Sequence, residues 1–208
     1  MGKKIFKVII ILVIIMLFIG TSYIIYTRLK ETTGSGKKVT VVDNISNYDY
    51  SLKSNSTKYM KSLFDELKDI LQKNPVVEED YAKKVAQLFV TDLFTLSNKL
   101  TSSDIGGIQF VYKSYQDDFI SIAQSGMYSS IQSNVYGDRK QELPEVIEVT
   151  ISKTNKNSFK YNKQTLSDAY YIDMDIKYKK DLGYPSKYQV VVAKNDKTME
   201  VVKASNLK

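Results

Sequence analysis

The chain has 208 residues, of which 43% are hydrophobic and 25% are charged, and its formal net charge is +7 at pH 7. It contains no cysteine and no histidine, which excludes disulfides, thiol nucleophiles, histidine acid–base catalysis and the usual zinc sites. Five of the 30 basic residues fall in residues 1–30, which hold no acid, so the rest of the chain is nearly balanced and we expect no nucleic-acid partner.

An uncharged apolar stretch occupies residues 8–26, close to the start of the chain. Its 19 residues, at about 1.5 Å per residue in a helix, are enough to cross the roughly 30 Å hydrocarbon core of a bilayer. Residues 8–26 are therefore predicted to form one transmembrane helix, after a cytoplasmic tail of residues 1–7. The side chains predicted to anchor it in lipid include Val8, Ile11, Ile15, Phe18, Ile25 and Tyr26.

Three lysines, Lys3, Lys4 and Lys7, precede this stretch and indicate its orientation. Because positively charged flanks resist translocation, we expect a single-pass cell-membrane protein with its N-terminus in the cytoplasm and its C-terminal domain outside. The alternative is a secretory signal that is cut near Gly20, which would leave an exported protein. The apolar residues 23–26 beyond that cut, and the lack of an Ala-x-Ala pattern, favour the uncleaved anchor.

Residues 27–56 are predicted to be a tether and linker, with one short strand over 39–42. From residue 57 the apolar residues take the spacing of an amphipathic helix, at Met60, Leu63, Phe64, Leu67, Ile70 and Leu71. Ser56 is the predicted N-cap of this helix, and Asn74 followed by Pro75 is predicted to end it.

Two further helices are predicted from the same spacing. The first spans residues 78–100, begins with three acidic residues that suit a helix N-terminus, and would form an antiparallel hairpin with the preceding helix. Gly106 and Gly107 predict a turn. The last helix is predicted over residues 112–132 and ends before Gly137.

After residue 143 the apolar spacing changes to the alternation that is typical of strands. Strands are predicted over residues 147–151, 170–178, 188–193 and 199–204. Residues 153–164 are predicted to be a polar loop or the end of a hairpin, and residues 194–197 the turn of a second hairpin. Helices followed by a four-stranded antiparallel meander indicate one α+β domain over residues 57–208.

Three helices followed by a long curved antiparallel sheet, over residues 57–205, resemble the cone of the nuclear transport factor 2-like superfamily. A short cytoplasmic tail, one transmembrane helix and such a domain outside resemble the inner-membrane scaffold subunits of bacterial type IV secretion and conjugation systems. The resemblance is one of element order, with no signature motif, and it transfers no functional residue. It implies a cone-like domain that acts as a scaffold in an envelope complex.

Asp173 and Asp175 are the best candidates for chemistry, because alternate residues of a strand share one face and lie about 6.5–7 Å apart. Two such carboxylates can share a proton, bind a cation or act as acid and base, and Tyr171 shares their face. Lys177 and Lys179 continue the same face, which is typical of an outer surface in water. We therefore predict no catalytic residue, and keep Asp173, Asp175 and Tyr171 as an alternative site.

No metal or cofactor is predicted, because the acidic residues 78–80 lack the spaced ligands of a calcium loop and the glycine pairs match no phosphate-binding loop. Richness in Lys, Ile, Asn and Tyr is typical of an AT-rich bacterial genome. We expect a non-enzymatic interaction or scaffold module, whose partners are the lipid bilayer, other membrane or envelope proteins and a second copy of the chain. The alternatives are a ligand-binding or enzymatic domain that uses Asp173 and Asp175, and an exported protein.

Overall fold

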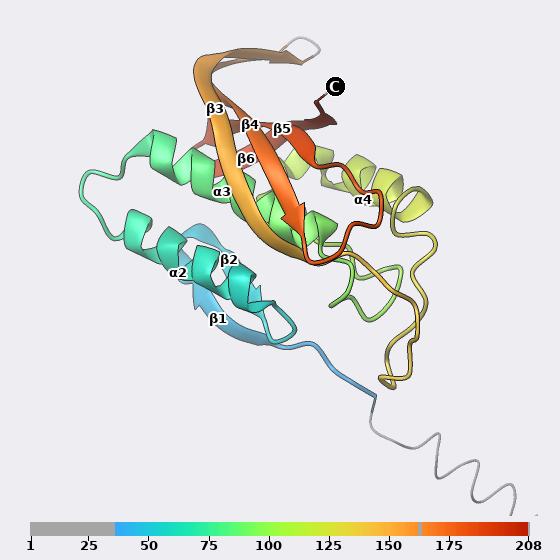
Figure 1. Ribbon diagram of the computed structural model, residues 1–208. Coiled ribbons are helices and arrows are strands. Elements are labelled where there is room, and N and C mark those ends of the chain that lie inside the picture. The colour runs from blue at the N-terminus through green and yellow to red at the C-terminus, as the bar shows by residue number, and fades with distance from the viewer. Residues whose placement is uncertain (1–35, 162–163, 208) are drawn as a thin grey trace, which may run out of the picture. The chain divides into compact units, whose positions relative to one another are not determined.

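The computed structural model describes residues 36–161 and 164–207, and residues Lys38–Lys208 form one compact unit. Helices and a four-stranded antiparallel sheet make this unit an α+β domain, as the sequence predicts (Figure 1). Its longer elements are β1 (Val41–Ile45), β2 (Tyr50–Lys53), α2 (Lys58–Leu71), α3 (Glu78–Phe94), α4 (Gln116–Ser125), β3 (Val146–Tyr161), β4 (Gln164–Tyr178), β5 (Lys187–Asn195) and β6 (Thr198–Asn206).

The four strands β3 to β6 pair in chain order, each antiparallel to the next. The hairpin of β5 and β6 has the predicted turn, where Asn195 pairs with Thr198. β4 has the predicted alternation, since Ile172 and Met174 are fully buried while Asp175 and Lys177 are exposed. One face of the sheet is therefore the core face. The opposite face contacts water at Asp175 and Lys177 but also carries a smaller buried apolar cluster, made of Phe159, Ala169, Val191, Ala193 and Val202.

Of the two alternatives for residues 153–164, a polar loop or the end of a hairpin, the structure shows the hairpin. β3 continues to Tyr161, and β4 begins at Gln164, so that the two strands pair along their whole length. Backbone pairing does not need buried side chains, and most residues of β3 beyond Ser152 are exposed on both faces. Three shifts of register interrupt the pairing, and the two strands bend together over the domain (Figure 1).

α2 and α3 form the predicted antiparallel hairpin, with α3 behind the sheet in the view of Figure 1. α2 begins one residue later than predicted, because the Thr57 hydroxyl, and not Ser56, caps it by accepting a hydrogen bond from the Met60 N–H (3.2 Å). Helix side chains also cover the free edge of β3: Tyr59 accepts a hydrogen bond from the Val149 N–H (2.8 Å), and Gln87 donates one to the Val149 carbonyl (2.8 Å).

Both later helices are shorter than predicted. α3 ends at Phe94 instead of residue 100, because the N–H groups of Leu96 and Ser97 donate to the Pro144 carbonyl (3.0 and 3.1 Å) and not to carbonyls of the helix. That contact draws the chain toward the start of β3. α4 covers only residues Gln116–Ser125 of the predicted 112–132, and Gly126 ends it.

The segment before α2 differs from the predicted linker. Residues 41–53 form a hairpin of β1 and β2, and this hairpin belongs to the compact unit. Tyr50 and Leu52 are only 2% and 5% exposed, and the Tyr50 hydroxyl bonds the Tyr81 hydroxyl (2.7 Å) and the Met199 carbonyl (3.0 Å). The domain therefore begins near Lys38, about twenty residues earlier than predicted.

Within residues 36–161 and 164–207, no helix is both long enough and apolar enough to span a bilayer. The predicted anchor, residues 8–26, and the lysines before it lie outside the described residues.

Candidate functional site

A cavity of about 860 Å³ lies between the core face of the sheet, α3 and α4. Its volume falls within the range of roughly 300–1,000 Å³ that is typical of small-molecule sites. The residues that define it come from α3 (Phe89, Leu93, Phe94), α4 and its flanks (Val111, Tyr115, Phe119, Ile122, Met127), the loop before β5 (Tyr184) and strands β5 and β6 (Tyr188, Val201, Ala204). Most of these side chains are apolar or aromatic, so the cavity is an apolar one.

Two aromatic pairs connect the walls of the cavity. The ring of Phe94 meets that of Tyr188 edge-on, with 5.1 Å between centroids, and links α3 to β5. The rings of Phe89 and Phe119, with 5.7 Å between their centroids, link α3 to α4. Each such pair stabilises the fold by about 0.5–1.5 kcal/mol beyond the contribution from burying the rings. Aromatic contacts therefore border the cavity on two sides.

α4 is a loosely packed wall of the cavity. Ala123 is its one buried residue, and the helix mainly contacts the two 3-10 turns that precede it, Ile108–Phe110 and Lys113–Tyr115. Ile122 lines the cavity but is 71% exposed, the largest exposure among the exposed large apolar side chains that the structure describes. An apolar side chain that is this exposed at the edge of an apolar cavity indicates a contact surface.

The polar groups of the cavity are few. The hydroxyls of Tyr184 and Tyr188 form no hydrogen bond with any residue that the structure describes. Burial raises the pKa of both phenols, so both stay protonated at neutral pH. Asp118 and Lys203 line the cavity at exposed positions, and neither forms an ion pair with a described residue. The cavity thus offers the phenols of Tyr184 and Tyr188 and one charge of each sign, and its other polar lining residues are Tyr115, Ser130 and Asn206.

The structure places the alternative site of Asp173, Asp175 and Tyr171 on the other face of the sheet. None of the three lines the cavity. Asp173 accepts a hydrogen bond from the Gln189 side chain (2.7 Å), and the Tyr171 hydroxyl donates to the Ser158 carbonyl (3.1 Å). Asp175 is exposed and lies opposite Lys187 in the register. The three side chains therefore share a face, as the alternation predicts, but they do not enclose a site.

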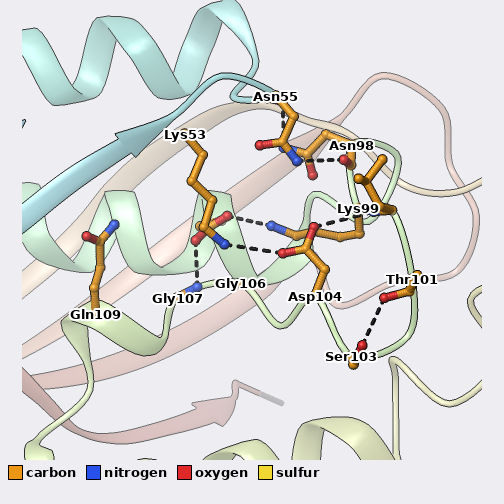
Figure 2. Close-up of polar contacts among 12 residues, drawn as sticks. Lys53, Asn55, Asn98, Lys99, Thr101, Ser103, Asp104, Gly106, Gly107 and Gln109 are labelled. Carbon is orange, nitrogen blue, oxygen red and sulfur yellow. Dashed lines mark hydrogen bonds and ion pairs between the residues drawn. The ribbon is translucent and has the colours of Figure 1, made fainter. Parts of the chain in front are cut away.

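Away from the cavity, a group of polar residues connects the end of α3 with the turn at Gly106 and Gly107 (Figure 2). The carboxylate of Asp92 accepts hydrogen bonds from the Lys99 ammonium (2.6 Å) and the Gly107 N–H (2.7 Å), and the Lys99 side chain is only 2% exposed. Burial raises the pKa of Asp92, but the charge of Lys99 and these hydrogen bonds outweigh it and hold that pKa below 3.8.

The same turn is attached to the β1–β2 hairpin. Lys53 pairs with Asp104 (3.2 Å), and the side-chain amides of Asn55 and Asn98 each donate to the backbone carbonyl of the other residue (2.8 and 3.0 Å), as Figure 2 shows. Each of these donors and acceptors connects two segments of the protein. We therefore interpret the group around Asp92 as structural and the apolar cavity as the candidate site.

The sequence does not distinguish most residues of the cavity from core residues, because apolar residues at helical or strand spacing look the same whether they face a cavity or another side chain. The exposed position of Ile122 on α4 was not predicted either. The signal in the sequence for a loosely packed helix was the sparseness of apolar residues in the third predicted helix, residues 112–132, compared with the first two.

The chain was also compared with known proteins. No protein-family model matches it, and neither the search of curated proteins nor the search of solved structures finds a match.

Proposed function

We propose that this chain is a membrane-anchored interaction module, without enzymatic activity, that acts on the outer side of a bacterial cell membrane as part of an envelope complex. Residues 8–26 would hold it in the bilayer. Confinement to a membrane raises the local concentration of other membrane components, so that even a modest contact surface suffices for assembly. The contact surface would be α4 together with the mouth of the cavity that it borders.

The apolar cavity with Ile122 exposed at its edge is the observation that carries this proposal. Apolar walls and protonated phenols suit binding, whereas acid–base catalysis at neutral pH needs a group that titrates near that pH. The two carboxylates that were the best candidates for chemistry lie on the opposite face of the sheet, away from this cavity.

The arrangement also supports the cone of the nuclear transport factor 2-like superfamily as the finer description of the fold. A sheet of four antiparallel strands bends around one long helix, α3 (Figure 1). The cavity is lined by that helix and by strands β5 and β6 of the sheet. A role in secretion or conjugation would follow from the order of the segments, and it rests on that resemblance.

The test is a pull-down of the full chain after cross-linking in native membranes, with the cross-linked residues mapped by mass spectrometry. We expect specific envelope proteins, cross-linked through residues of α4. Ile122→Glu should lower their recovery at least tenfold, because it places a charge on the proposed surface. Ile147→Glu is the matched control, since Ile147 is also an exposed isoleucine, at 39%, but lies on β3. Equal recovery with both variants would contradict the proposal.

The double variant Asp173→Asn, Asp175→Asn is expected to fold normally and to recover the same partners as the wild-type chain. Asp173 keeps a neutral hydrogen-bond partner in Gln189, and Asp175 is exposed, so that little free energy of unfolding depends on either charge. Thermal unfolding and the same pull-down measure both effects. Loss of the partners from a normally folded double variant would favour the alternative site over the cavity.

Small-ligand binding is the second candidate function, because the volume and the apolar walls of the cavity also fit a small molecule.

A further inference from the structure

We infer that the cavity binds a single-chain, lipid-like amphiphile: one apolar chain against its walls and a head group that accepts hydrogen bonds from Tyr184 and Tyr188. The inference deepens the proposed function and rests on it, since it takes the outer side of a membrane as the place where the domain meets its ligand.

The apolar chain follows from the walls of the cavity. Phe89, Leu93 and Phe94 form one wall from α3, and Val201 forms part of the opposite wall on β6. Apolar surface that a ligand covers gains about 25 cal/mol for each Å² removed from water, so this lining favours an apolar occupant over water. A cavity of about 860 Å³ is too small for a folded partner but has room for one such chain.

The head group follows from the two phenols. Tyr184 and Tyr188 line the cavity, both are protonated at neutral pH, and neither hydroxyl has a hydrogen-bond partner among the residues that the structure describes. A ligand oxygen is the natural acceptor for both donors. Lys203 and Asp118 carry opposite charges on the lining, so the recognition would depend on hydrogen bonding and not on net charge.

Two features bear on how the ligand would reach the cavity: the packing of α4 and the length of the tether. α4 carries one buried residue and does not pack tightly on the sheet, so it can move aside for a ligand. The predicted tether and linker begins at residue 27, and the compact unit begins at Lys38, so that 11 residues remain between the predicted anchor and this unit. They can span at most about 40 Å. The domain would therefore stay within reach of the membrane surface, where single-chain amphiphiles concentrate.

The test uses the full chain in native membranes with a palmitic acid that carries a diazirine in its chain. Ultraviolet light attaches the probe to neighbouring residues, and mass spectrometry of peptides identifies them. We expect labelling in α4 and in residues 182–206, in addition to residues 8–26. Labelling of residues 8–26 is an internal control for the membrane anchor, so that failure of the inference is distinguishable from failure of the proposed function.

Ala204→Phe should fill part of the cavity and lower its labelling at least tenfold, without affecting the labelling of residues 8–26. Thr150→Phe is the matched control, because Thr150 is an exposed position of β3 outside the cavity. Thermal unfolding of both variants shows whether the new phenylalanine is tolerated.

The double variant Tyr184→Phe, Tyr188→Phe removes two oxygens and no apolar surface, so that the fold is retained. At subsaturating probe we expect the labelling of the cavity to fall about tenfold for each hydroxyl that binds the carboxylate. Tyr136→Phe, at an exposed tyrosine outside the cavity, should change nothing. Cavity labelling that is absent in the wild-type chain, or equal in all these variants, would overturn the inference. So would a peptide of another protein cross-linked in the cavity in place of the probe.

Discussion

Asp92→Asn is expected to lower the free energy of unfolding by about 3–5 kcal/mol. The substitution keeps the size of the side chain but leaves the ammonium of Lys99, whose side chain is 2% exposed, without a counter-charge in the protein interior. Chemical denaturation followed by circular dichroism measures the loss. Glu79→Gln is the matched control: it breaks the exposed pair with Lys83, and we expect about 0.5 kcal/mol or less.

The same substitution should change how stability depends on pH. Because the pKa of Asp92 is lower in the folded protein than its usual 3.8, the carboxylate stabilises the fold above that value. This contribution is lost as the pH falls through the pKa of the folded state. The free energy of unfolding of the wild-type protein should therefore fall more steeply below about pH 4 than that of Asp92→Asn, which has no carboxylate to titrate there.

A second substitution separates the cost of an unpaired charge from the loss of contacts. In Asp92→Asn combined with Lys99→Met both charges are gone, so we expect most of the stability to return. If the double variant were as unstable as Asp92→Asn alone, the ion pair would not be the cause of the loss.

Gly106→Ala is the other change with a large expected effect, a loss of about 3 kcal/mol or more. A Cβ atom at residue 106 would lie 2.0 Å from the carbonyl oxygen of Asp92 and 2.8 Å from the Lys99 ammonium. The backbone of α3 would have to move, and the hydrogen bond from the Gly107 N–H to Asp92 would be broken or lengthened. Thermal unfolding and the rate of proteolysis within residues 95–111 measure the effect.

Gly183→Ala is the control for Gly106→Ala. Gly183 has a φ of +77°, and no atom lies within 4 Å of the position that its Cβ would take. Only the strain of a left-handed conformation remains, about 1–2 kcal/mol. If Gly106→Ala were no worse than Gly183→Ala, the close contact between the turn and α3 would be looser than the structure indicates.

The sequence by itself indicated the helices α2 and α3, the alternation of β4 and the hairpin of β5 and β6. Each of these elements buries one side only, and one-sided burial leaves a local period in the residues of that element, such as the buried Ile172 and Met174 beside the exposed Asp175. The α+β class follows from the order of such periods, and no long-range contact is needed to read it.

The tertiary structure alone decided the extent of the β3–β4 pair, the place of the β1–β2 hairpin and the site. Backbone hydrogen bonds hold β3 and β4 together through a polar segment that the sequence assigns equally well to a loop or to the end of a hairpin. Tyr50 is buried by residues as distant in the chain as Met199. Asp92 and Lys99 are charged residues of a type that is usually exposed, but in the structure the Lys99 side chain is only 2% exposed and that of Asp92 only 15%. A cavity depends on the gap left between elements, here α3, α4 and the sheet, and that gap has no signature in any one of them.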